Sequence, residues 1–199
     1  MNLVVRDVPL REGITSDEFR NAMRHLTGGV SVITAARGDD ISGMTVTSVA
    51  SLAVDPPTLT VAINRNASTL PLIRRYGAFG VNILSGEQAG VAERFTGKDG
   101  HKGAERFAGS SWTIGAFGVP LLRDALVAIG CEAEELIERH SHVIALGRVV
   151  HLAASEGNAA LAYWRGEYLA IERNSDIQRI SDQAKTDKSY DSSWAKAVT

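Results

Sequence analysis

GMTVTSVASLAVDPP, residues 43–57, is the stretch on which the fold prediction rests. Apolar and hydroxyl side chains alternate from Met44 to Thr47, which is the two-residue period of a half-buried strand. The alternation ends after Thr47, and Pro56-Pro57 cannot donate hydrogen bonds to a sheet. The strand is therefore predicted to run into a surface segment whose backbone and hydroxyl groups are open to a ligand.

The hydroxyl groups of this stretch allow two interpretations. Thr45, Thr47, Ser48 and Ser51 are neutral donors with no formal charge among them, which suits a weakly charged heterocycle or a phosphate held by neutral groups. Threonine is also common in ordinary strands that bind nothing. The residues alone leave both interpretations open.

Composition favours one soluble domain. The chain has 199 residues, of which 44% are hydrophobic, and 21 basic against 23 acidic residues give a net charge of -2. No basic stripe indicates nucleic acid as a partner, and no apolar run or N-terminal pattern indicates a membrane span or a signal peptide, so a cytoplasmic location is expected. Cys131 lies in an apolar run and is expected to be buried and inert.

The first half of the chain predicts a helix followed by strands. Thr15 and Glu18 form a capping-box pattern for a helix that ends at Gly28-Gly29, and Ile14 can pack on Phe19. Residues 30–36 and 58–64 have strand patterns, and the polar turn at residues 37–40 predicts a hairpin with the strand that begins at Met44.

The next loop has features of an anion site. Asn64, Arg65 and Thr69 surround Ser68, which is a suitable cap for a helix reaching about Tyr76. Free backbone N–H groups at a helix start favour negative charge, although simple capping beside a solvated Arg65 explains the same residues. In the strand at residues 79–84, the amide of Asn82 is expected either to hold a backbone turn or to bind a ligand.

The second half of the chain adds a possible lid and further strands. Residues 87–95 are predicted to be helical, 98–108 to form a mobile lid, and the region around Trp112 and Pro120 to be irregular. The strands expected at residues 125–137 and 143–152 carry a Glu cluster and His140-Ser141-His142, but neither has the ligand spacing of a metal site. The domain is placed at residues 15–173, between an arm (1–14) and a polar tail (174–199) that is either disordered or lies over another subunit.

Common nucleotide-binding motifs are missing. The sequence has no G-x-G-x-x-G after a strand, no P-loop and no G-x-S-x-G elbow. Several short strands with few helices favour a mainly β fold with peripheral helices, and a small barrel rather than a doubly wound sheet.

Several short motifs occur in a fixed order along the chain. They are FR (19–20), LTGGV (26–30), GMTVTSVASLAVDPP (43–57), NR (64–65) with Ser68, FGVNIL (79–84), AERF (92–95) and YWRGEY (163–168). Together they resemble the flavin reductase family, the reductase components of two-component flavin monooxygenases, over roughly residues 16–172. The resemblance implies an FMN-binding split β-barrel.

The resemblance also implies an activity and a site. A family member is a homodimer in which NADH or NADPH passes a hydride to FMN or FAD, and a partner monooxygenase receives the reduced flavin. Carried over to this chain, the residues implied at the flavin are Thr45, Val46, Thr47, Ser48, Ser51, Asn64, Arg65, Ser68, Thr69, Asn82, Arg94 and Phe95. His142 and Tyr168 are implied on the nicotinamide side, although His140 and Ser141 stand where members often carry glycine and aspartate.

The expected reaction requires little acid–base chemistry, because the protein has only to stack two rings and polarise one of them. Two other functions compete with the reductase. One is a flavoprotein that retains FMN and acts on another small substrate, and the other is a flavin-binding module without activity. The sequence does not distinguish FMN from FAD, NADH from NADPH, or one oxygenase partner from another.

Overall fold

The computed structural model of the chain describes residues 13–156 and 159–172, and most of these residues lie in β-strands. The predicted mainly β fold with peripheral helices is confirmed. The strands are β1 (Gly28–Gly29), β2 (Ser31–Arg37), β3 (Asp40–Val46), β4 (Val49–Ala53), β5 (Thr58–Asn64), β6 (Ala78–Ile83), β7 (Trp112–Ile114), β8 (Pro120–Leu122), β9 (Val127–Arg139), β10 (His142–Ala154), β11 (Ala159–Trp164) and β12 (Glu167–Glu172). The helices are α1 (Ser16–Met23), α2 (Thr69–Tyr76) and α3 (Ala89–Thr96), with 3-10 turns η1 (Gly103–Phe107) and η2 (Ala116–Gly118).

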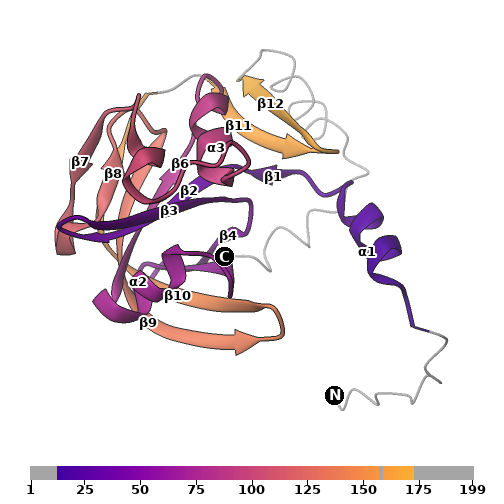
Figure 1. The fold of residues 1–199 in the computed structure, drawn as a ribbon, viewed down its shortest axis with the longest axis horizontal. Helices are drawn as coiled ribbons and strands as arrows, with labels where there is room; N and C mark the ends of the chain where they lie inside the picture. Colours follow the sequence, from indigo (N-terminus) through magenta and orange to yellow (C-terminus); the bar gives the residue numbers. More distant parts are fainter. Residues whose placement is uncertain (1–12, 157–158, 173–199) are drawn as a thin grey trace, which may run out of the picture.

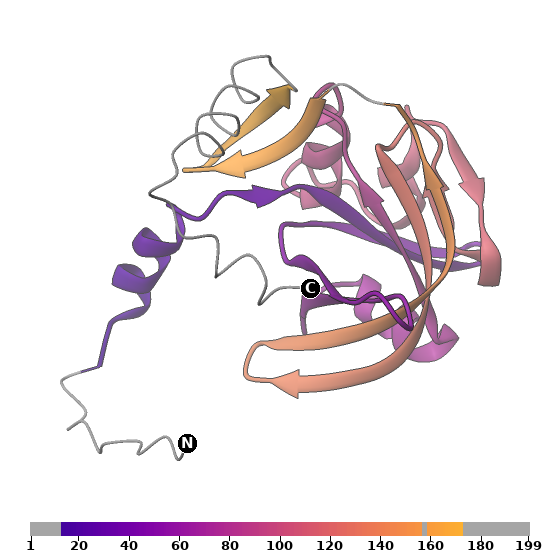
Figure 2. The same ribbon diagram turned by 180° about the vertical axis from the view of Figure 1, so that it is seen from behind.

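One seven-stranded antiparallel sheet forms the body of the fold, in the order β3-β2-β6-β9-β10-β5-β4 (Figures 1 and 2). Its two edges, β3 and β4, follow each other in the chain and are separated only by Thr47 and Ser48. The sheet therefore has to curl until its edges approach, yet they do not pair with each other. This open seam is what makes the barrel a split barrel, and the predicted stretch at residues 43–57 crosses it.

Two apolar clusters lie on the two faces of this sheet. β2 contributes to both, because Ile33 and Ala35 belong to one cluster while Val32, together with Val30 just before the strand, belongs to the other. The first cluster fills the barrel under α2, and the second lies under α3 and β8. Burial on both faces explains why residues 30–36 are apolar without the alternation of a half-buried strand.

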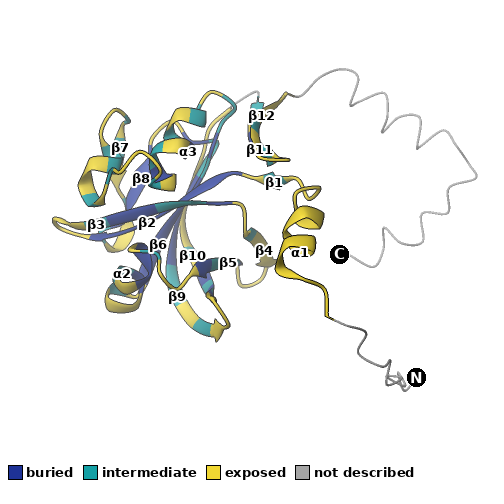
Figure 3. Cartoon of the chain, turned by 45° about the vertical axis from the view of Figure 1, so that its right-hand side comes forward, coloured by how far each residue is buried: buried dark blue, intermediate teal, exposed yellow. Residues whose placement is uncertain are grey.

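α2 and α3 end where the sequence predicts, but α1 ends at Met23, before the predicted end at Gly28-Gly29, and these two glycines form strand β1. Thr15 and Glu18 form the expected capping box at the start of α1, and Gly77 and Gly97 adopt left-handed conformations at the ends of α2 and α3. The apolar side chains of α1 have little cover from the described residues, since Phe19 is 61% exposed (Figure 3).

Two regions differ from the sequence prediction. The segment after Thr47, predicted only as a surface segment, forms the edge strand β4, and its side chains are mostly exposed as expected. The region from Trp112 to Pro120, predicted to be irregular, contains the short hairpin β7–β8. Strands of three residues are too short to show a period of two.

Parts of the prediction lie outside the described residues, namely almost all of the N-terminal arm and the polar tail at 174–199 with Trp194. Among residues 13–156 and 159–172, no helix is long and apolar enough to cross a membrane.

Candidate functional site

A cavity of about 1580 Å³ opens beside the seam of the barrel. Its walls come from β3, the start of α2, α3, the segment that follows α3, and the turn between β11 and β12. The lining includes seven of the predicted site residues, Thr45, Val46, Thr47, Asn64, Ser68, Phe95 and Tyr168. These positions span 124 residues of sequence, from 45 to 168, and only the tertiary fold brings them to one cavity.

β3 forms the central wall. It is an edge strand, so the backbone groups on its outer side have no strand partner and are available to a ligand. The Thr45 hydroxyl donates to the Ala92 carbonyl at 2.6 Å and so holds α3 against this wall. Ser48 and Ser51 do not line the cavity; Ser48 Oγ donates to the Ala62 carbonyl at 2.8 Å, and Ser51 is exposed on β4.

A chain of hydroxyls lies at the start of α2. Ser42 Oγ, which is buried in β3, is 2.8 Å from Ser68 Oγ and 3.1 Å from Thr69 Oγ1. Ser68 occupies the N-cap position, but its side chain makes no capping hydrogen bond. Thr69 is fully buried behind Ser42, so Ser68 is the member of the predicted pair that faces the cavity.

Two predicted polar residues make their contacts away from the cavity. Arg65 forms an ion pair with Glu138 at the end of β9, where Arg74 also pairs with the same carboxylate at 2.7 Å. Asn82 is fully buried, and its amide donates to the Val32 carbonyl at 3.0 Å and accepts from the Leu122 backbone N–H at 2.7 Å. Of the two roles considered for Asn82, its contacts fit the structural one.

Phe95 anchors an aromatic cluster behind the cavity wall. Its ring packs on Phe107 at 5.0 Å and on Trp112 at 5.5 Å between centroids. It also covers Gly43 so closely that a Cβ there would lie 2.6 Å from the ring, which explains why glycine interrupts the strand at this point. Arg94, its neighbour, is partly buried and does not line the cavity.

A pair of tyrosines lines the part of the cavity next to the β11–β12 turn. The rings of Tyr163 and Tyr168 lie 5.3 Å apart at the two ends of the β11–β12 turn, and both line the cavity beside Glu93. Burial, with the nearby Tyr163 and Glu93, raises the pKa of Tyr168 above its ordinary value. Its hydroxyl is thus a neutral donor at the cavity wall at neutral pH.

His142 lies beside the cavity rather than in its wall. It begins β10 directly opposite Asn64, which does line the cavity, and its Nδ1 atom is 2.9 Å from Ser141 Oγ. The side chain is exposed, so a second substrate entering over Asn64 has access to it.

The sequence interpretation missed the basic residues of the wall. Lys98, Lys102 and Arg106 line the cavity from the segment that was predicted only as a lid. Basic residues in a polar, glycine-rich loop have the pattern of ordinary solvated charge, and only the packing of η1 against β3 shows that they face a cavity.

The described lining offers binding groups rather than a reactive centre. Neutral hydroxyls, free strand edges and aromatic rings suit a flat heterocycle with a polar edge, and a basic end suits a phosphate. In the part of the chain that the structure describes, no cluster of His, Cys, Asp and Glu has metal-site geometry. The fold and cavity thus define a split-barrel protein whose cavity suits a flat ligand with a polar edge.

Comparison with known proteins identifies the family. The model of the flavin reductase like domain matches residues 23–172, so the chain belongs to that family. Its relatives include proteins named FMN reductase (NADH) RutF from Agrobacterium fabrum strain C58 and Methylorubrum extorquens strain PA1. The first is 34% identical over 77% of this chain and 87% of its own length, and the second 35% identical over 81% and 93%.

Solved structures show the same fold. BorF, the flavin reductase component of a bacterial two-component tryptophan halogenase, has a TM-score of 0.74 and 27% identity over 80% of this chain and all of its own. A homologue of nitrilotriacetate monooxygenase component B from Mycobacterium thermoresistibile has a TM-score of 0.72 and 28% identity over 79% of this chain and 88% of its own. The predicted family and split-barrel fold are confirmed.

Proposed function

We propose that this protein is an NADH-dependent FMN reductase that supplies reduced flavin to a separate oxygenase. The observation that carries the proposal is the cavity on the edge of β3, where neutral hydroxyls, an aromatic wall and a basic end converge within a member of the flavin reductase family. The choice of NADH and FMN rests on the names of its relatives, which cover most of the chain. We expect it to act in the cytoplasm, where NADH is available.

The residues present fit a flavin nucleotide. The unpaired outer edge of β3 at Thr45 and Val46, with Thr47 directly after the strand, suits the hydrogen-bonding edge of an isoalloxazine ring. Asn64 at the end of β5 and Ser68 at the start of α2 suit the ribityl chain and phosphate, while Phe95 and Tyr168 supply apolar surface. The other predicted residues do not line the cavity, and no direct contact with the flavin is proposed for them; they are Ser48, Ser51, Arg65, Thr69, Asn82 and Arg94.

A bound flavin would supply the acceptor for the hydride of NADH. The chain's own contribution is to bind and orient the two rings in contact and to exclude water between them. Backbone N–H groups on the outer edge of β3 are placed to donate to the ring edge on which negative charge develops. Tyr168 and His142 border the space left for the nicotinamide, and no described side chain is required as a general base.

One assay tests the proposal and its alternatives. Purified protein is mixed with each of the four pairs of NADH or NADPH with FMN or FAD, and NADH or NADPH oxidation is followed at the nicotinamide absorbance band. We expect FMN-dependent oxidation of NADH to be the fastest. A protein that purifies with bound FMN and leaves both nicotinamides unconsumed is instead a flavoprotein with another substrate, and flavin binding without any turnover indicates a binding module.

The proposal includes a homodimer. Several apolar side chains are exposed, among them Leu26 after α1 (65% exposed) and Leu52 on β4 (56%), and an exposed edge strand such as β4 needs cover. Light scattering coupled to gel filtration measures the mass directly. A monomer at micromolar concentration would contradict this part of the proposal.

A further inference from the structure

Arg106 joins three parts of the cavity wall. Its Nε donates to the His101 carbonyl at 2.9 Å and its Nη1 donates to the Gly43 carbonyl of β3 at 2.7 Å. Its Nη2 lies so close to Gly97, the last cap of α3, that a Cβ there would stand 2.5 Å from it. One planar guanidinium thus spans the start and the middle of the 97–105 segment and fastens both to the edge strand of the cavity.

The end of the segment is fixed separately. Phe107, the next residue, packs in the aromatic cluster with Phe95 and Trp112, and the Trp112 indole N–H donates to the Phe107 carbonyl at 3.1 Å. Between Gly97 and this cluster, Lys98, Lys102 and Glu105 are exposed. Because the aromatic cluster holds only the end of the segment, the Arg106 contacts are what place its middle against β3.

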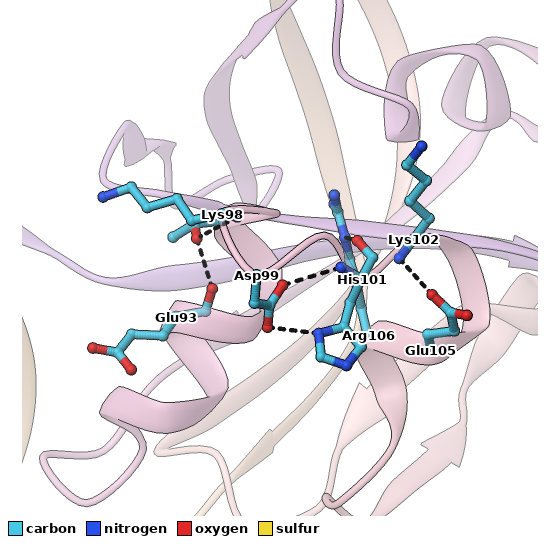
Figure 4. Close-up of polar contacts among 8 residues, drawn as sticks. Glu93, Lys98, Asp99, His101, Lys102, Glu105 and Arg106 are labelled. Carbon is cyan, nitrogen blue, oxygen red and sulfur yellow. Dashed lines mark hydrogen bonds and ion pairs between the residues drawn. The ribbon is translucent and has the colours of Figure 1, made fainter.

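Both carboxylates within the segment are already engaged, whereas Glu93 of α3, which also lines the cavity, makes no side-chain hydrogen bond or ion pair with the described residues. Asp99 accepts from the His101 backbone N–H at 3.1 Å and pairs with the His101 ring at 2.7 Å, and Glu105 accepts from the Lys102 backbone N–H at 3.1 Å (Figure 4). Asp40, across the cavity, is bonded to Tyr76 and Arg75. Among residues 13–156 and 159–172, no carboxylate pairs with the ammonium group of Lys98 or Lys102.

We propose that Arg106 is a positioning residue that holds segment 97–105 on β3 and thereby presents Lys98 and Lys102 to the phosphate of a flavin nucleotide. The ligand is a phosphate monoester because the cavity holds two unpaired ammonium groups on this wall, while Arg65, the cation that the sequence predicted for this role, is paired with Glu138. The inference rests on the proposed flavin site and adds the recognition of its phosphate.

The test compares FMN with riboflavin, which has the same ring and ribityl chain and no phosphate. Dissociation constants are measured by flavin fluorescence for the wild type and for Lys98→Gln/Lys102→Gln. We expect the double variant to bind FMN about tenfold more weakly and riboflavin within about twofold of wild type. Arg74→Gln/Arg139→Gln removes the same charge outside the cavity and is expected to leave both constants unchanged.

Arg106→Lys separates position from charge. The lysine keeps the positive charge, but a single ammonium group cannot reach two carbonyls with the geometry of the planar fork. We expect this variant to weaken FMN binding about as much as the double lysine variant, and to increase amide hydrogen exchange in residues 98–105 while exchange in β9 and β10 stays the same. The exchange experiment is run without flavin, so it reports on Arg106 even if no flavin binds.

Two kinds of result overturn the proposal, one for the lysines and one for Arg106. Equal weakening of FMN and riboflavin by the lysine substitutions would show that they do not recognise the phosphate. Wild-type FMN affinity or unchanged hydrogen exchange in Arg106→Lys would show that Arg106 does not position the segment. A protein that binds both flavins with the expected preference but does not oxidise NADH would refute the proposed reductase activity while supporting this inference.

Discussion

Replacement of Asn82 tests whether this residue serves the fold or the ligand. The Asn82 amide is fully buried and bonds the Val32 carbonyl of β2 and the Leu122 amide of β8, so it ties β6 to two other strands. Asn82→Ala removes both hydrogen bonds inside the protein. Each is worth about 1 kcal/mol net, and more when its partner stays buried without another, so the expected loss of unfolding free energy is about 2–4 kcal/mol.

The assay is urea unfolding of the flavin-free protein, followed by tryptophan fluorescence and circular dichroism. With a slope of about 2 kcal/mol per molar urea, a loss of 3 kcal/mol lowers the midpoint by about 1.5 M. Flavin binding is then measured at zero urea, where the variant is still folded. Because Asn82 does not line the cavity, we expect the FMN dissociation constant to change less than about twofold.

Asn82→Asp is the matched control, since it keeps the shape and the acceptor for the Leu122 N–H. Its carboxylate faces the Val32 carbonyl, so burial and this acceptor should raise its pKa in the folded state. A raised folded pKa contributes stability at low pH that is lost as pH rises, and the variant should therefore lie closer to wild type at pH 5 than at pH 7. An Asn82→Ala protein of wild-type stability with FMN binding weakened tenfold would refute the structural role.

Three further predictions concern the core, pH and substrate binding. Gly147→Ala on β10 places a methyl group against the Phe79 ring and 3.0 Å from the Cys131 Cβ, and should lower the free energy of unfolding in urea by about 2–3 kcal/mol. Gly90→Ala is the control, because no atom lies within 4 Å of the added methyl group and the free energy of unfolding should not fall. Burial raises the pKa of Cys131 from 9.0 to about 12, so the unfolded thiol ionises first and stability falls above pH 9. The loss should reach about 1.4 kcal/mol at pH 10 and be absent in Cys131→Ala, and parallel pH profiles would contradict it. His142→Ala should raise the KM for NADH and leave kcat within about twofold in steady-state assays, and complete loss of hydride transfer with normal flavin binding would exclude a binding role.

Local signals in the sequence predicted most of the elements correctly. The capping box at Thr15 and Glu18, the turn at residues 37–40 and the alternation at residues 58–64 depend on neighbouring residues alone, and the structure reproduces each of them. The short hairpin β7–β8 was missed because three residues do not establish a period. β4 was predicted only as a surface segment because the alternation of apolar and hydroxyl residues ends at Thr47.

In the candidate site, too, local signals predicted some features correctly, while contacts between distant residues were not predicted. The stretch at residues 43–57 indicated the polar wall because hydroxyls that alternate along one strand share a face, and Thr45 and Thr47 do line the cavity. Sequence order also placed Ser68 at a helix start, but its hydroxyl bonds to Ser42, a partner 26 residues away. Nothing local to Arg65 indicates its pairing with Glu138, which requires the turn after β9 to approach the start of α2.

The sequence by itself determined most of the strands, the ends of α2 and α3 and the motif order that marks the family, because each depends on periodicity or on residues within a few positions of one another. Only the tertiary structure decided which charges meet the cavity. Arg106 reaches β3 across 63 residues of chain, and this contact turns a loop that resembles solvated charge into a wall with Lys98 and Lys102. Contacts between residues so distant in the chain leave no local pattern in the sequence. They arise only when the seven-stranded sheet curls and brings distant segments together.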